Sequence, residues 1–441
     1  MQAAFFKHAF QRPSREQVLA TLLSTSAFAV ALCGSKNEIA TGIFVGLLEW
    51  LFILTFYISY RRYDAYRLLR QHRLIYGLFC CWFLCVVAGY LRLFLVRLPV
   101  EDTGFYHLAA SVRLLQTVLH VFFVLSVASF LLHAGQYAGR VLYALLAGIL
   151  VLLGVYLYQW ACAPVLDAEV WFMGPPLAFH IRLVGYLAAT GSAVALAAML
   201  TSGRGLKTTV FFLFLLSLLA LLFWLGGRAS LLAGLAVMAV GLFIVCFAAS
   251  AKRWQYAALL LVSVLLAYYL AQHFFIFPWN GFSQTFHKDM ADLSASISPV
   301  ETVNLNRLTT GRLQIWRETL QALTESLWLG WGPNGYLFIP GHRIGFGIHP
   351  HNFVVQFLIE WGVLGAVSVL ALLLMLVVRL FRQLPQLLAA KNFPALGAAF
   401  ILLALSINGL ADGTFYHAQS LFYLSLAFAI FPFFKHRSFP T

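Results

Sequence analysis

Long runs of hydrophobic positions follow one another along almost the whole chain, and short polar segments separate them. A membrane-spanning helix needs about 20 mainly apolar residues. By this criterion the pattern predicts about twelve spans, at roughly 17–33, 38–59, 74–96, 107–132, 139–161, 177–200, 206–225, 229–250, 254–275, 352–378, 393–410 and 416–434. The expected fold class is therefore an all-α polytopic integral membrane protein, with residues 1–441 in a single transmembrane domain.

The composition agrees with this interpretation, because 62% of the residues are hydrophobic and only 10% are charged. A soluble domain carries about 25% charged residues, so a soluble fold is excluded. The formal net charge of +14 does not indicate nucleic-acid binding. The basic residues fall mostly in short clusters between the hydrophobic runs, which is the pattern that orients a protein in a membrane.

More than half of the 29 Lys and Arg residues occur in one alternating set of connections, whereas the short connections of the other set hold Lys36, Arg92, Arg97 and Arg228. The positive-inside rule places the basic set, and with it both termini, in the cytoplasm. If the membrane is the inner membrane of a bacterium, the other face is periplasmic. Since the periplasm holds no ATP, a reaction there has to use energy that is already stored in a substrate.

The one long connection, 276–351, is expected on that outer face, and loops of this length are usually functional. Within it, TTGRLQIWRETLQALTES predicts an amphipathic helix near the membrane surface, with Thr309 or Thr310 as its N-cap. The following GWGPNGY, 330–336, predicts a tight turn with a left-handed position. The expected apolar stripe of the helix is formed by Leu313, Trp316, Leu320 and Leu323.

Two arginines of the outer face are candidates for anion binding. Arg228 follows two glycines at the outer end of the eighth span. A guanidinium in that place can grip a phosphate with two hydrogen bonds, although a charge that merely reaches the interface has the same pattern. Arg312 lies in the first turn of the loop helix, where the helix dipole favours a bound anion. For Arg317, on another side of the helix, we expect a surface or ion-pairing role.

The stretch HPHNFVVQFLIEWGVLG, 349–365, places polar residues at the mouth of a span. A histidine in such a place is more often an interface residue, but the ordinary pKa of about 6.5 suits His351 to take a proton from a hydroxyl. Asn352 beside it offers a supporting amide. His349 and His351 could share a metal ion, yet the sequence shows no obvious carboxylate ligands for it, so we expect no metal site.

An acidic residue, Asp412, stands in the outer turn GLADGTFYH, which is otherwise mostly small and apolar. It could orient a histidine or accept a proton, and the plain alternative is a turn or cap aspartate. His417 in the same turn is expected to be an interface residue. Arginines suit a diphosphate and a histidine suits the activation of a hydroxyl. Together they favour the transfer of a group from a lipid pyrophosphate to an alcohol.

These residues resemble the O-antigen ligases and their relatives, the O-antigen polymerases and the periplasmic protein O-oligosaccharyltransferases. The ligase motif is a His followed by Asn, Ser or Gln, then nine residues, Gly, two residues, and Gly, Thr or Tyr. His351, Asn352, Gly362 and Gly365 fit this motif in full.

Three further stretches add to the resemblance, so that its motifs cover roughly 215–415. GRLQIWRETLQALTESLWLGWGPNGY looks like the family's arginine helix and glycine-rich turn, with Arg312 in the arginine position. GGRASLLAG looks like the preceding arginine motif, with Gly227 where the family often has Ser or Thr. Asp412 stands where the family tends to carry an aspartate.

The resemblance implies a GT-C-like glycosyltransferase of the bacterial inner membrane with a periplasmic active site. It would move a polysaccharide from undecaprenyl pyrophosphate to a sugar hydroxyl of the lipid A-core, with inversion and without metal, ATP or another cofactor. His351 would be the general base, Arg228 and Arg312 would bind the pyrophosphate, and Asp412 would support the histidine or the acceptor. The partners would be these two substrates and membrane lipids, with no obligate protein partner.

Alternatives remain open. A polymerase or a protein O-oligosaccharyltransferase would use the same chemistry, and the full histidine motif favours the ligase. A transporter of lipid-linked glycans would use the arginines only for binding and would need charges within the membrane. The candidates for such charges are Glu49, which could pair with an arginine across helices, Arg113 and Arg182. A metal site in the first outer loop is not expected, because Glu38 is the one acid of GSKNEIA.

Overall fold

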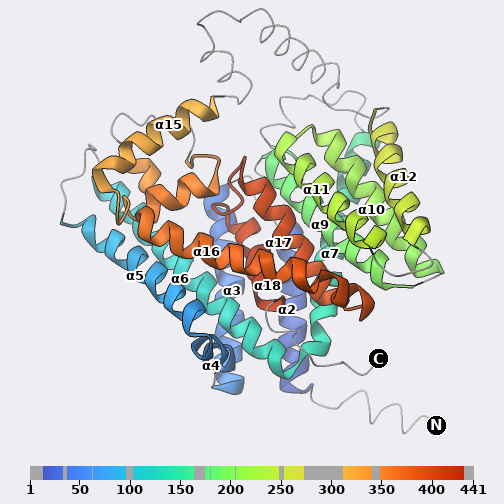
Figure 1. Cartoon of the computed structure of the whole chain (residues 1–441), viewed down its shortest axis with the longest axis horizontal. Helices are drawn as coiled ribbons and strands as arrows, with labels where there is room; N and C mark the ends of the chain where they lie inside the picture. Colours follow the sequence, from blue (N-terminus) through green and yellow to red (C-terminus); the bar gives the residue numbers. More distant parts are fainter. Residues whose placement is uncertain are drawn as a thin grey trace, which may run out of the picture.

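The computed structural model describes residues 13–32, 37–61, 63–95, 103–162, 174–178, 180–203, 205–247, 253–272, 311–339 and 348–431. Within these ranges the chain is helical and contains no strand, so the all-α fold class is confirmed for them (Figure 1). More than half of the long connection expected at 276–351 lies outside the described residues.

A helix occurs at each of the predicted spans. By length and composition, nine helices of the described ranges can cross a membrane. Two more, α17 and α18, are apolar but shorter, and α2 begins with Arg15 and Glu16. The protein is therefore a multi-pass membrane protein, and spans beyond nine remain a prediction. The helices are α2 (Arg15–Leu32), α3 (Glu38–Tyr60), α5 (Arg73–Arg92), α6 (Thr103–His133), α7 (Ala138–Cys162), α9 (Ile181–Thr201), α10 (Leu206–Leu225), α11 (Arg228–Phe247), α12 (Arg253–Gln272), α16 (Phe353–Ala389), α17 (Phe393–Gly409) and α18 (Ala418–Ile430).

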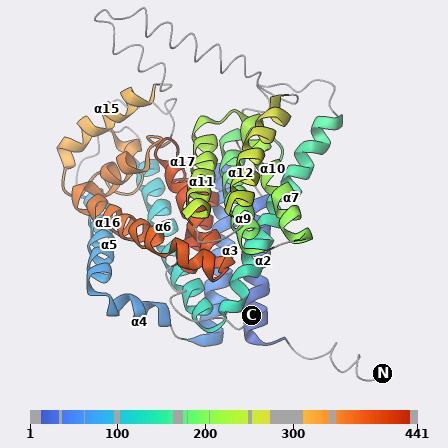
Figure 2. The same ribbon diagram turned by 45° about the vertical axis from the view of Figure 1, so that its right-hand side comes forward.

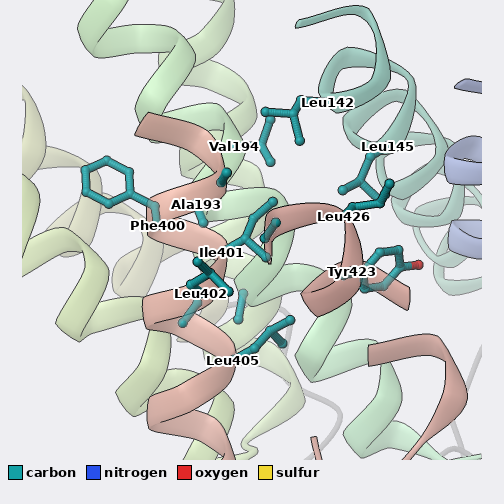
Figure 3. Packing of buried hydrophobic residues seen from close by; sticks show 14 of the residues in the cluster. Leu142, Leu145, Ala193, Val194, Phe400, Ile401, Leu402, Leu405, Tyr423 and Leu426 are labelled. Atoms are coloured by element: carbon teal, nitrogen blue, oxygen red, sulfur yellow. The ribbon is translucent and has the colours of Figure 1, made fainter. Parts of the chain in front are cut away.

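The centre of the bundle is α9, which is buried along its length. Its sequence is rich in Ala, Gly and Ser, and such small residues let membrane helices approach one another closely. It packs against α7, α10, α11 and α17 (Figure 2), and α18 packs against α17. Figure 3 shows the resulting core, in which α7, α9, α17 and α18 contribute Leu142, Leu145, Ala193, Val194, Phe400, Ile401, Leu402, Leu405, Tyr423 and Leu426.

A second hydrophobic cluster joins the loop helix α15 (Arg312–Leu323) to the first half of α16. α15 and the short helix α4 (Asp64–Gln71) lie at opposite ends of the bundle in both views (Figures 1 and 2). One face of α15 packs on this cluster, so α15 is part of the folded core at its end of the bundle. The cluster comprises Leu93, Ala110, Ala322, Leu323, Trp331, Tyr336, Phe338, Ile339 and Ile359.

One detail predicted for the loop helix is wrong. α15 begins at Arg312 with Gly311 as its N-cap, not Thr309 or Thr310. Gly311 has a φ of 79°, a left-handed conformation that glycine adopts most easily. Of the expected apolar stripe, Leu323 is buried and Leu320 is 42% exposed. Thr319 and Ala322 are buried with Leu323, since this face packs on the second cluster.

The tight turn at 330–336 is confirmed, with Asn334 in the left-handed conformation at a φ of 59°. The Asn334 side chain donates a hydrogen bond to the carbonyl of Ala109 at 3.0 Å and so ties this turn to α6.

The three charges considered for a transport path each have a partner in the fold. Glu49 lies 2.8 Å from Nδ1 of His120, so its partner is a histidine and not one of the arginines considered. Arg113 donates hydrogen bonds of 3.0 Å to the carbonyls of Phe415 and Tyr416. Arg182 lies in the first turn of α9, not in the middle of a span. These contacts account for all three charges and weaken the transporter alternative.

Candidate active site

The structure brings His351 and Asp412 into contact. Nδ1 of His351 lies 3.2 Å from Oδ1 of Asp412, and the second side chain is 3% exposed. A carboxylate only accepts hydrogen bonds, so Nδ1 of the histidine carries the proton and donates. Nε2 then keeps its lone pair. This arrangement orients the imidazole and leaves one nitrogen able to take a proton from a hydroxyl.

The backbone holds His351 in an unusual conformation. Its φ is 54°, in the left-handed region that residues other than glycine rarely occupy and that is frequent at functional sites. The next residue, Asn352, is the N-cap of α16 and accepts hydrogen bonds from the backbone N–H groups of Val354 and Val355. Its amide nitrogen donates to the carbonyl of Leu410 at 2.9 Å. Asn352 therefore supports the site by joining the start of α16 to the turn that carries Asp412.

The two glycines of the histidine motif serve packing. Gly362 interrupts α16 with a φ of 65°, and a side chain there would collide with the backbone of Trp328. At this interruption the N–H of Trp331 donates to the carbonyl of Ile359 at 2.7 Å. A Cβ on Gly365 would lie 3.0 Å from that of Cys85 on α5. The motif thus combines the candidate base His351 with the residues that fix its helix.

Arg182 is a site residue that the sequence analysis assigned to a different role. Its Nη1 lies 3.9 Å from Oδ1 of Asp412 and 3.5 Å from Nδ1 of His351. The side chain is 36% exposed, so the guanidinium reaches both the buried carboxylate and the open side of the site. Its place in the first turn of α9 could have been read from the sequence, but a single arginine near a span end has many ordinary explanations.

The two predicted arginines, Arg228 and Arg312, lie within electrostatic reach of each other, and Arg312 also lies within reach of Asp412. The pKa of Arg312 is lowered, chiefly by burial and also by the charges of Arg182 and Arg228. The negative charge of Asp412 acts in the opposite direction. Arg228 is the exposed first residue of α11, and the neighbouring Ser230 accepts a hydrogen bond of 2.9 Å from Asn408. Arg182, Arg228 and Arg312 each lie in the first turn of a helix, where the helix dipole favours an anion. Arg317 is exposed on α15, as expected for a surface residue.

Two contacts fix the elements that carry these groups. Nε1 of Trp316 on α15 donates to the carbonyl of Pro350 at 2.8 Å, which ties the Arg312 helix to the residue before His351. Arg113 donates hydrogen bonds to the carbonyls of Phe415 and Tyr416 and so holds the turn between α17 and α18 in place. It also lies 4.0 Å from the carboxylate of Glu360 on α16.

The environment sets the protonation of the pair. Burial lowers the pKa of His351 and outweighs the opposing effect of the Asp412 carboxylate, so the imidazole is neutral at neutral pH. Burial opposes the ionisation of Asp412, but the hydrogen bond from His351 and the charge of Arg182 hold the pKa of this carboxyl below its usual value. A neutral histidine beside an ionised aspartate is the state that general-base catalysis needs.

A cavity of about 180 Å³ lies beside the pair and is lined by further histidines. His349 is 4% exposed, and its Nδ1 accepts the backbone N–H of His351 at 3.1 Å. The rings of His349 and His417 lie 5.0 Å apart. Nδ1 of His417 lies 2.6 Å from Oε1 of Glu38, so the N-terminal ends of α18 and α3 also meet here. The lining residues are Glu38, His180, Arg182, Leu183, Ile348, His349, His351 and His417.

The donor atoms of His349, His351 and Asp412 lie within 4.8 Å of one another, close enough to share a metal ion. Nδ1 of His349 already accepts a backbone N–H, and Oδ1 of Asp412 accepts that of Gly413 at 2.9 Å. The guanidinium of Arg182 faces the same carboxylate oxygen. Because a metal cation and the guanidinium would repel each other there, the geometry favours the aspartate as the partner of His351 and Arg182.

Residues 194–370 match the family model described as O-antigen ligase. This segment runs from the middle of α9 to α16 and contains Arg228, Arg312 and His351, whereas Glu38, Arg182, Asp412 and His417 lie outside it. No curated protein sequence matches the chain. The family resemblance found in the sequence is therefore confirmed for the segment that carries the histidine motif.

Proposed function

Because the chain carries the O-antigen ligase domain, we propose that it transfers an O-antigen polysaccharide from undecaprenyl pyrophosphate to a sugar hydroxyl of the lipid A-core. The family match supports glycosyl transfer of the ligase or polymerase kind. The observation that carries the proposal is the contact of His351 with Asp412 beside three arginines. This combination provides a base for an acceptor hydroxyl next to a binding site for a diphosphate.

In the proposed reaction, Nε2 of His351 takes the proton of the acceptor hydroxyl. The oxygen attacks the anomeric carbon while the bond from that carbon to the pyrophosphate oxygen breaks, so the configuration inverts. The electron pair of the broken bond goes to the leaving undecaprenyl pyrophosphate. Asp412 holds the imidazole in the right tautomer and stabilises the imidazolium that forms. General-base catalysis of this kind contributes about 10²–10⁴-fold in rate.

The arginines are proposed to act on the donor. Arg228 and Arg312 would bind the pyrophosphate, and Arg182 joins them because its guanidinium lies at the open side of the His351–Asp412 pair. In the free protein the positive charges repel one another, and a bound diphosphate removes this repulsion. As the glycosidic bond to phosphate breaks, negative charge grows on the oxygen that these groups face, so they stabilise the transition state more than the ground state.

The energy of the donor phosphate bond and the presence of an internal base make nucleotide and metal unnecessary for this mechanism. We place the protein in the bacterial inner membrane as one GT-C-like transmembrane domain, with both termini cytoplasmic and the site periplasmic. The alternation of basic connections supports this orientation. The proposed partners are the lipid-linked glycan, the lipid A-core and the surrounding lipids.

The test is a reconstitution of the purified protein with undecaprenyl-pyrophosphate glycan and lipid A-core, in EDTA and without nucleotide. We expect a ladder of glycosylated lipid A-core on a gel. Longer lipid-linked glycan without modified lipid A-core would indicate a polymerase. Movement of the lipid-linked glycan across the membrane without a covalent product would indicate a transporter, and dependence on added metal ions would contradict the metal-free mechanism.

A further inference from the structure

A second histidine–carboxylate pair lines the same cavity and has no part in the mechanism above. Nδ1 of His417 lies 2.6 Å from Oε1 of Glu38, with side chains that are 13% and 23% exposed. His417 is the N-cap of α18 and Glu38 the first residue of α3. The two residues come from opposite ends of the sequence, so the fold itself creates this pair.

We propose that His417 and Glu38 form the acceptor subsite, which binds sugar hydroxyls of the acceptor and holds the attacking hydroxyl toward His351. This assignment rests on the proposed function and specifies which substrate occupies which side of the cavity. His349 lies between the two pairs, with ring centroids 4.3 Å from His351 and 5.0 Å from His417. The space beside them is large enough for the ring of one monosaccharide.

The distribution of charge separates the two substrates. Arg182 and Arg312 act on His351, and Arg228 acts on Arg312. Arg182 lines the cavity next to His351, whereas the pair of Glu38 and His417 adds a carboxylate to the same lining. A diphosphate would be repelled by that carboxylate, whereas sugar hydroxyls are neutral and donate hydrogen bonds to it. The donor therefore belongs with the arginines and the acceptor with Glu38.

The hydrogen-bonding pattern of the pair suits hydroxyl groups. A carboxylate accepts, so Nδ1–H of His417 donates to Glu38, and Nε2 of His417 becomes an acceptor. Glu38 and His417 together thus present acceptors to a ligand rich in O–H donors. His351 has the same arrangement, but it lies beside the arginines, where the bond to the leaving phosphate breaks. Both pairs can hold a hydroxyl, and only the one next to the donor activates it.

Glu38 and His417 lie in other parts of the sequence than the proposed base and the two predicted arginines. The matched O-antigen ligase segment holds His351, Arg228 and Arg312, whereas Glu38 and His417 lie outside it. Acceptor choice can therefore change through α3 and α18 while the transfer chemistry of the matched segment is retained.

The test is a kinetic comparison in the full-length reconstituted protein, with lipid A-core and undecaprenyl-pyrophosphate glycan varied in turn. Loss of a hydrogen bond to a charged group costs about 1.5–3 kcal/mol. We therefore expect Glu38→Gln and His417→Gln each to raise the KM for lipid A-core by about 10–100-fold. The KM for the donor should stay within about twofold, since donor contacts are unchanged.

The matched control is Glu49→Gln, which breaks another histidine–carboxylate pair of α3, with His120 at 2.8 Å, outside the cavity lining. It should leave the KM for lipid A-core unchanged. An unchanged acceptor KM in both site variants, or an equal rise for donor and acceptor, would overturn the subsite while leaving the transfer reaction intact. Absence of any transfer product from the wild-type protein would instead overturn the proposed function. Two separate site variants keep the test decisive if one of them does not fold.

Discussion

Nδ1 of His351, at the mouth of α16, lies 3.2 Å from Oδ1 of Asp412, in the turn between α17 and α18. This contact gives the imidazole a fixed tautomer and an ionised neighbour. Replacing Asp412 by Asn keeps the shape of the side chain but removes the charge that holds the imidazole. We expect the turnover rate at saturating substrates to fall on the order of 10²-fold.

The control for this prediction is Asp64→Asn. Asp64 also pairs with a histidine, His133, at 2.8 Å, but it lies on α4 at the other end of the bundle. If both aspartate variants lost activity equally, the effect would be a general loss of structure and not a property of the His351 pair.

The pH dependence of transfer should report the charge around His351. Activity needs the neutral imidazole, so kcat/KM should fall as the pH drops through the pKa of His351, which burial places below 6.5. The charge of Arg312 lowers this pKa, so Arg312→Gln should raise it and move the acid limb to higher pH. Asp412 raises the same pKa, so Asp412→Asn should move the limb to lower pH.

Rate profiles between about pH 4 and 8 measure this shift, because the kcat/KM profile reports groups of the free enzyme. Arg317→Gln is the matched control on α15, since this arginine is exposed and does not act on His351. Shifts of the same sign in the Arg312 and Asp412 variants would exclude His351 as the titrating group.

The interruption of α16 should depend on glycine. Alanine at position 362 would have to adopt a φ of 65° and a ψ of −175°, a combination that is essentially restricted to glycine, and its side chain would collide with the backbone of Trp328. We expect Gly362→Ala to lower the thermal unfolding temperature and the activity together. Gly154→Ala on α7 is the control, because a side chain there meets nothing within 4 Å. A normal unfolding temperature of Gly362→Ala would show that the interruption is not required.

The effects of Arg113 and Glu360 on the stability of the protein should be coupled and not additive. Arg113→Met leaves the Glu360 carboxylate without its cation, and removing one partner of a buried ion pair costs about 3–5 kcal/mol. The double variant Arg113→Met/Glu360→Gln removes the uncompensated charge and should be more stable than Arg113→Met alone. Unfolding temperatures of the wild type, Arg113→Met, Glu360→Gln and the double variant give the coupling. If the losses of unfolding temperature were additive, Arg113 and Glu360, 4.0 Å apart, would not stabilise each other.

The positions of the helices were predictable because long apolar runs mark segments that can cross a membrane, while spans beyond the nine candidates in the described ranges remain a prediction. His351 and Asp412 were found because each is a polar residue in an apolar setting, and the structure brings them together. Asn352 was expected to support the site through its amide, and it does so as a helix cap.

Pairings between distant segments were not predictable from one sequence. Glu38 and His417 each looked ordinary, and only the packing of α3 beside α18 brings them within 2.6 Å. Arg182 was counted as a membrane charge because its place at the first turn of α9 depends on where that helix begins. The cap at Gly311 was missed because a threonine offers a side-chain oxygen for the cap hydrogen bond, whereas Gly311 caps the helix without a side-chain hydrogen bond.

The rate of a His351→Asn variant tests the central claim most directly. Asparagine tolerates the left-handed conformation that His351 adopts, at a φ of 54°, so the backbone can be preserved while the base is lost. With His133→Asn as the control, we predict a fall in single-turnover rate on the order of 10²-fold or more and an unchanged unfolding temperature. A rate within about threefold of wild type in a folded protein would contradict the assignment of His351 as the general base.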